Sequence, residues 1–85
     1  MEVPTVAVVT ERLRQLILEV VNVPAAQVTS SATIDGELQM QSVAFVELQV
    51  AIEEEYDIQI DPIRVVELNQ FSAIVEYVHA LILGK

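Results

Sequence analysis

Apolar and polar residues alternate near the start of the chain with the period of an α-helix. Charged and amide side chains occupy the faces between the apolar positions. The pattern predicts a helix over residues 5–22, which we expect to end before Pro24 because proline disfavours helical geometry at the preceding residue. The apolar positions that recur at i, i+3, i+4 and i+7 spacing are Leu13, Leu16, Ile17, Val20 and Val21.

A second periodic segment predicts a helix over residues 42–56. Glu47 and Glu54 fall on the side opposite its apolar face. Gln49 falls on the inward side, where a buried amide needs hydrogen-bond partners. Gln49 therefore either lies at the edge of the core or lines a pocket. The residues expected in the core are Phe45, Leu48, Ile52 and Tyr56.

Two further helices are expected in the last third of the chain. Asp61 and Pro62 predict the start of a short helix over residues 62–68, because aspartate caps helices well and proline fits the first helical position. Asn69 is a plausible N-cap for a last helix over residues 70–83, and Gly84 is a stop. The core positions of this last helix are expected to be Phe71, Ile74, Val75, Val78 and Ile82.

Residues 23–41 show no helical period and contain many turn-forming residues, so we predict a long loop held by Val28, Ile34 and Leu38. Structureless loops of this length are unusual in compact domains and are often functional, although this one could also be a spacer between helices. The predicted fold class is all-α, a four-helix bundle with a long loop between its first two helices and a short third helix. We expect a single domain over residues 1–85.

Composition and charge narrow the class of function. The chain has 85 residues, of which 53% are hydrophobic, so it is not a disordered acidic tail despite a net charge of -9. With 13 acidic and 4 basic residues, it would be repelled by nucleic acid and attracted to basic partners. We expect no membrane span and no signal peptide. The absence of cysteine excludes disulfides and fits a cytoplasmic protein.

Groups suited to catalysis are sparse. His79 is the single histidine, and we expect it at the surface or boundary without a chemical role. Residues 53–55 are all glutamate, but consecutive helical residues point about 100° apart and cannot converge on one ion. The sequence has no phosphate-binding glycine loop, since Gly36 and Gly84 are its only glycines. We therefore predict that the chain is not an enzyme.

Ser42 stands where the long loop meets the second predicted helix. The first N–H groups of a helix are unpaired and its dipole is positive there, so a phosphate on Ser42 would be favourably placed. Taken alone, this serine reads as an ordinary N-cap.

The residues around Ser42 resemble the acyl carrier protein family. Leu38 to Val43 is followed without a gap by Val46-Glu47-Leu48 and by Glu53-Glu54-Glu55-Tyr56-Asp57, at the family's spacing from its serine. The resemblance implies that Ser42 carries a covalent 4'-phosphopantetheine arm, derived from coenzyme A, whose thiol holds acyl groups as thioesters. The implied partners are a phosphopantetheinyl transferase and acyl-loading and acyl-processing enzymes with basic docking patches. We expect a cytoplasmic monomer.

Two residues beside Ser42 depart from the family's Asp-Ser-Leu signature. Gln41 replaces the aspartate, which in the family helps the transferase recognise its target, and Val43 replaces the leucine. A neutral Gln41 weakens that charge contact. The matching transferase is therefore expected to be unusual, or Ser42 is left unmodified in a degenerate carrier.

Further departures concern the surface that would meet partner enzymes. Ala44, Ile63 and Val66 stand where the housekeeping fatty-acid carriers commonly have acids. If exposed, Val43, Val50, Ile63 and Val66 form a mixed apolar and acidic strip beside Glu47 and Glu54 that marks a docking surface, and otherwise Ile63 and Val66 fill the core. Docking would indicate a dedicated fatty-acid, polyketide or related specialised pathway. The predicted docking residues are Gln41, Val43, Ala44, Glu47, Val50, Glu53, Glu54, Ile63 and Val66.

Two other functions remain open on the sequence. One is a helical interaction or adaptor module that keeps the carrier fold without the arm. The other is a carrier for aminoacyl or aryl cargo. If Gln49 lines a pocket, that pocket would favour a short or polar acyl group over a long alkyl chain.

Overall fold

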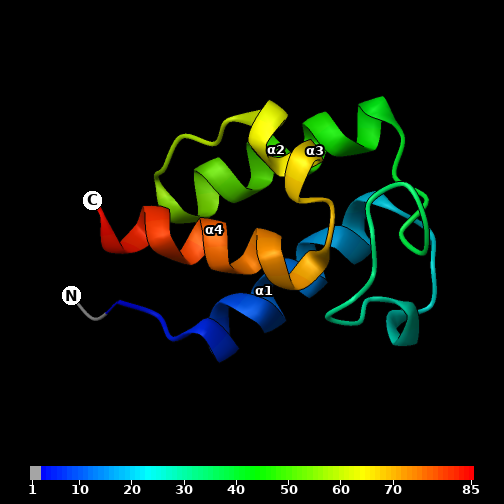
Figure 1. The fold of residues 1–85 in the computed structure, drawn as a ribbon, viewed down its shortest axis with the longest axis horizontal. Coiled ribbons are helices and arrows are strands. Elements are labelled where there is room, and N and C mark those ends of the chain that lie inside the picture. Colours follow the sequence, from blue (N-terminus) through cyan, green and yellow to red (C-terminus); the bar gives the residue numbers. More distant parts are fainter. Residues whose placement is uncertain (1–2) are drawn as a thin grey trace.

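The computed structural model describes residues 3–85, which form four α-helices, the third of them short (Figure 1). The prediction of an all-α four-helix fold with a long loop between its first two helices is confirmed. Nowhere in the described range is a helix both long and apolar enough to cross a bilayer. The helices are α1 (Val6–Val20), α2 (Ser42–Tyr56), α3 (Pro62–Leu68) and α4 (Phe71–Leu83), and a 3-10 turn, η1 (Ala25–Gln27), lies in the loop.

The first helix is shorter than the pattern predicted, at both ends. Thr5 lies outside it and caps it, with its Oγ1 accepting a hydrogen bond of 3.2 Å from the Val8 N–H. At the other end Val21 is already extended, so α1 stops before Pro24 can act on it. Val20 and Val21, expected in the core, are only half-buried, whereas the fully buried Val9 was missed.

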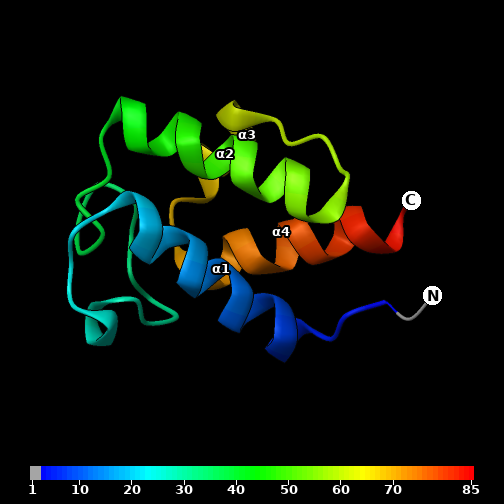
Figure 2. The ribbon, with the colours of Figure 1, turned by 180° about the vertical axis from the view of Figure 1, so that it is seen from behind.

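The helices pack around α1, which contacts both α2 and α4, while α3 packs on α4. Figures 1 and 2 show α1 and α4 side by side and antiparallel, with the long loop at one end and both termini toward the other. The core positions predicted for α4 are all buried, as are Leu48 and Ile52 of α2. Phe45 and Tyr56 are only half-buried, because they lie toward the two ends of α2 at the rim of the core.

The long loop follows the core closely. Its predicted anchors Val28, Ile34 and Leu38 are buried, and so are Ala32 and Met40, which the pattern did not single out. A loop with this many buried side chains has a fixed path. It therefore contributes to the core and also sets where α2 begins.

Asn69 fixes this loop to the junction between α3 and α4. The Ile34 N–H donates to both the backbone oxygen and the side-chain Oδ1 of Asn69, each at 3.0 Å. Asn69 was predicted as the N-cap of α4 but is the C-cap of α3, with φ 62°. Gln70 occupies the N-cap position of α4 without a side-chain hydrogen bond.

The first N–H groups of α4 are paired by the loop in place of a side-chain cap. Phe71 N–H donates to the Ala32 oxygen at 2.8 Å, and Ser72 N–H donates to the Ser30 oxygen at 3.0 Å. Because loop carbonyls already pair these N–H groups, α4 does not need Asn69 as its N-cap, and Asn69 is instead the C-cap of α3.

Removing the Asn69 amide should destabilise the fold. We expect Asn69→Gly, which tolerates the positive φ, to lower the free energy of unfolding in urea by about 1–2 kcal/mol through the lost hydrogen bond. Asn69→Ala should cost more, because it also strains the backbone. Gln70→Ala is the matched control and should change little, since Gln70 is exposed and its side chain makes no capping bond. Wild-type stability in Asn69→Gly would contradict this role.

Candidate functional site

Ser42 is the first residue of α2 and is exposed. The N-cap is Gln41, whose backbone is extended and whose side chain makes no capping hydrogen bond. The sequence taken alone suggested a serine N-cap, and this is wrong because Ser42 already lies inside the helix. Among residues 3–85 no side chain caps the start of α2, so the Ser42 hydroxyl is not used for this purpose.

The backbone just before Ser42 is tightly held. Gln39 turns the chain with φ 48°, and the Met40 N–H then donates to the Ile34 oxygen at 2.8 Å. The buried Met40 side chain fixes this segment to the core. Ser42 is therefore an exposed residue on a firmly positioned backbone.

The electrostatic surroundings of Ser42 suit a covalently attached phosphate. Phe45 provides the first N–H that bonds within the helix, to the Gln41 oxygen at 2.9 Å. The N–H groups before Phe45 thus point outward at the positive end of the helix dipole. The first turn of α2 carries no acidic side chain. This arrangement fits a phosphodiester on Ser42.

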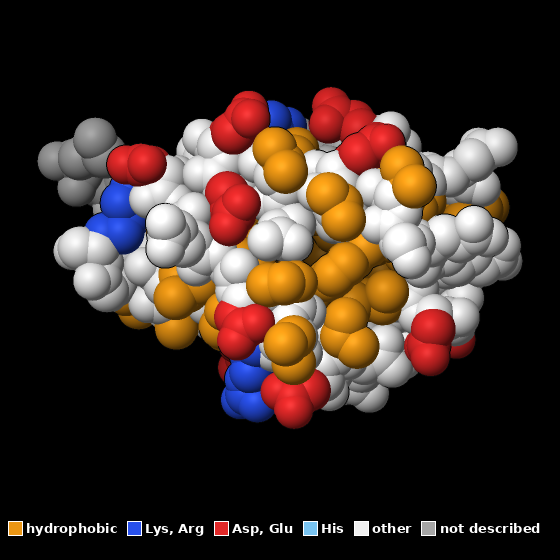
Figure 3. Space-filling view, turned by 90° about the horizontal axis from the view of Figure 1, so that it is seen from above, with side chains coloured by type: hydrophobic (Ala, Val, Ile, Leu, Met, Phe, Trp, Pro, Cys, Tyr) orange, Lys and Arg blue, Asp and Glu red, His pale blue; other side chains and the backbone are white. Residues whose placement is uncertain are grey.

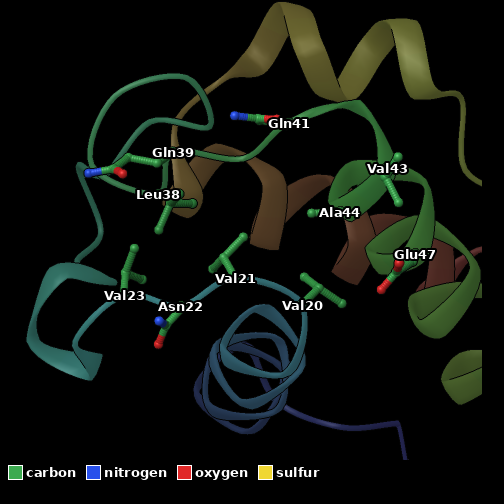
Figure 4. Close-up of a pocket in the computed structure, with 10 residues that line it drawn as sticks. All are labelled: Val20, Val21, Asn22, Val23, Leu38, Gln39, Gln41, Val43, Ala44 and Glu47. Atoms are coloured by element: carbon green, nitrogen blue, oxygen red, sulfur yellow. The ribbon is translucent and has the colours of Figure 1, made fainter.

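A groove of about 410 Å³ runs beside Ser42, between the end of α1, the loop and the start of α2. Figure 4 shows Leu38 and Ala44 on one side of it and Val20 and Val21 on the other. Gln41, Val43, Ala44 and Glu47 of the predicted docking set line this groove, although Ser42 itself does not. The other lining residues are Val20, Val21, Asn22, Val23, Leu38 and Gln39.

Apolar side chains also gather on the outer surface of α2 and α3. Ile63 is 70% exposed and Val66 57% exposed, so these residues do not fill the core. Val43 and Val50 are exposed as well, and Val46 joins them although the sequence analysis did not place it there. Its spacing from Val43 and Val50 on one helix face was the available signal. We call Val43, Val46, Val50, Ile63 and Val66 the apolar strip.

Acidic groups surround the apolar side chains on this surface (Figure 3). Glu47 and Glu54 are exposed, as the predicted docking role requires. Glu53 is half-buried, and its Oε2 accepts a hydrogen bond of 2.9 Å from the Ile60 N–H. This contact makes Glu53 less available to a partner than expected. Ala44 is likewise half-buried, against the core.

Gln49 lies at the edge of the core. Its Nε2 donates a long hydrogen bond of 3.4 Å to the Ile60 oxygen, and within residues 3–85 no buried side-chain nitrogen or oxygen lacks a partner. The cavity beside it measures about 10 Å³, no more than the space of one water molecule. In the described part of the chain, therefore, Gln49 does not line a preformed pocket for an acyl group.

His79 lies half-buried at the boundary of α4, with its Nε2 3.0 Å from the Pro4 oxygen. Across residues 3–85, three or more His, Cys, Asp or Glu side chains nowhere come together in a way that could hold a metal ion. The site is thus built from one exposed serine and its surroundings.

The family model for the phosphopantetheine attachment site matches residues 11–78, most of the chain and centred near Ser42. The chain belongs to this family. An acyl carrier protein of Buchnera aphidicola subsp. Schizaphis graminum is 28% identical over 71 residues, which cover 84% of this chain and 90% of that protein. The resemblance found in the sequence is confirmed, and the cofactor is covalently attached 4'-phosphopantetheine.

The unused hydroxyl of Ser42 leads to a stability prediction. Ser42→Ala should unfold in urea at the wild-type midpoint, because the hydroxyl caps nothing. Asp61→Ala is the comparison: the Asp61 side chain caps α3 by accepting from the Ile63 N–H at 3.0 Å, so its loss should cost about 1 kcal/mol. A loss for Ser42→Ala as large as that for Asp61→Ala would show that the serine is a cap after all.

Proposed function

We propose that this protein is an acyl carrier whose Ser42 hydroxyl holds the 4'-phosphopantetheine arm. The observation that carries the proposal is an exposed hydroxyl that caps nothing, at the start of α2 and inside the segment matched by the family. A transferase joins the Ser42 oxygen to the phosphorus of phosphopantetheine, the nucleotide part of coenzyme A leaves, and the hydroxyl proton passes to the transferase. When attached, the arm supplies a thiol that carries acyl groups as thioesters.

The residues around Ser42 support attachment without taking part in the bond chemistry. The free N–H groups at the start of α2 stabilise the negative phosphodiester, and the first turn holds no carboxylate to oppose it. Gln41 keeps the position before the serine neutral. The carrier does no bond-making of its own and presents its cargo to successive enzymes.

The apolar strip and the exposed acids Glu47 and Glu54 form the proposed docking surface. Its partners would combine an apolar centre with basic side chains around it, in keeping with the net charge of -9. Such encounters should be weak and should weaken further with salt, since the carrier must leave each enzyme. Ile63 and Val66 of this strip stand where the housekeeping carriers commonly have acids, which supports a dedicated fatty-acid, polyketide or related specialised pathway. We further propose that the carrier is a cytoplasmic monomer.

Mass measurement after co-expression with a broad-range phosphopantetheinyl transferase tests the attachment. Wild-type protein should gain the mass of one phosphopantetheine, and Ser42→Ala should gain none. Ser31→Ala is the control, because Ser31 is an exposed serine elsewhere in the loop, and it should be modified like the wild type. An unmodified wild type would favour the adaptor function instead.

Charge placed in the apolar strip tests the docking surface. Val50→Glu and Val66→Glu should each lower kcat/KM of the transferase for this carrier by about tenfold, the effect of losing one contact of ~1.4 kcal/mol. Val8→Glu is the control, since Val8 is as exposed as Val66, at 57%, but lies on α1. Raising the salt concentration should slow modification of the wild type. Equal rates for all three variants would rule out the strip as the docking surface.

A further inference from the structure

The segment between α2 and α3 is hydrogen-bonded to α2 through the backbone N–H and the backbone oxygen of Ile60. Its N–H donates to Glu53 Oε2 at 2.9 Å, and its oxygen accepts from Gln49 Nε2 at 3.4 Å. Gln49 and Glu53 are one turn apart on the same face of α2. We call this arrangement of Gln49, Glu53 and Ile60 the Ile60 clasp. The bond to the glutamate is the stronger of the two, because a charged acceptor shortens and strengthens it.

The clasp closes the surface over the core. The Ile60 side chain is buried and, with Gln49, borders the cavity of about 10 Å³. Pockets that hold small ligands are typically about 300–1,000 Å³. An acyl chain could enter here only if the connection moved away from α2. The Ile60 N–H and oxygen would then lose their partners next to the core, which is unfavourable for backbone groups.

The clasp also lies in line with Ser42. Gln49 follows Ser42 by seven residues, or two helical turns, so both side chains leave the same face of α2 about 10 Å apart along the axis. A flexible arm that leaves Ser42 along this face passes Phe45 and Val46 on the next turn of α2 and then meets the clasp. The exposed residues of the apolar strip lie beside this path, with Val46 on the next turn of α2.

We infer that the Ile60 clasp keeps an acyl chain carried on Ser42 out of the helical bundle. The cargo then stays at the outer surface beside the apolar strip. Because this position is exposed to solvent, it suits short or polar acyl groups better than long alkyl chains. This inference rests on the proposed function, since it assigns the cargo of the same serine.

A tether that does not depend on the transferase tests the inference. The chain has no cysteine, so Ser42→Cys creates a unique thiol that can be alkylated with N-ethyl or N-dodecyl iodoacetamide. The ethyl group ends short of the clasp and the dodecyl chain reaches past it. Methyl resonances of Leu48, Ile52 and Ile74, which line the cavity, report on whether the chain enters. With the clasp intact, these resonances should have the same chemical shifts for both labels.

Opening the clasp should admit the long chain. In Ser42→Cys carrying Gln49→Ala and Glu53→Ala, the dodecyl label should shift the core methyl resonances and give contacts between the chain and Ile74, and the ethyl label should not. Glu54→Ala is the matched control, because Glu54 is the exposed neighbour of Glu53 and makes no bond to Ile60. Should the double variant not fold, Gln49→Ala alone is compared in the same way.

Two results would overturn the inference. One is a shift of the core methyls by the dodecyl label while the clasp is intact. The other is a folded clasp variant whose core is unaffected by that label. Neither result depends on the mass measurement, so a wrong cargo assignment and a wrong attachment site are distinguishable.

Discussion

The position of Ser42 depends on the hydrogen bonds made by the backbone N–H and the backbone oxygen of Ile34. The N–H of Ile34 is held by Asn69 at the junction of α3 and α4, and its oxygen accepts from Met40, two residues before Ser42. The junction between α3 and α4 is thereby connected to the start of α2 through a single loop residue, Ile34. This explains how a long loop without regular structure can present one hydroxyl from a firmly positioned backbone. An exposed serine on a mobile loop would offer a transferase no comparable geometry.

Periodicity predicted α1, α2 and α4 because each buries one face, and the Asp61-Pro62 start signal predicted α3. That information lies within each segment. It could not assign Asn69, whose partner Ile34 is 35 residues away in the sequence. The predicted bounds of the second helix, residues 42–56, are those of α2, but the sequence could not show that Gln41 takes the N-cap position, since this depends on where the loop places Gln41. The Ile60 clasp was missed for the same reason. Gln49 and Glu53 read as an edge amide and a surface acid until the connection after α2 is placed against them.

The departures from the family's signature take on physical meaning in this structure. Gln41 removes a charge that would help a basic transferase, yet it also leaves the start of α2 free of carboxylates where the phosphate would lie. The residues that replace acids on α3 are exposed, so Ile63 and Val66 change the surface and leave the core as it is. The proposed docking surface therefore combines apolar side chains with the acids around them, and the proposed exclusion of cargo from the bundle would set this carrier apart from one that hides long chains. Together these two proposals agree with short or polar cargo passed among a few dedicated enzymes.

Everything proposed for this carrier depends on Ser42, and no other hydroxyl, bearing the arm. The most direct measurement is fragmentation mass spectrometry of the protein after reaction with coenzyme A and a transferase, which locates the added mass along the chain. Fragments containing Ser42 should carry the phosphopantetheine, and fragments containing the other serines and threonines should not. Added mass on another residue, or a chain left unmodified by every transferase tried, would contradict this assignment.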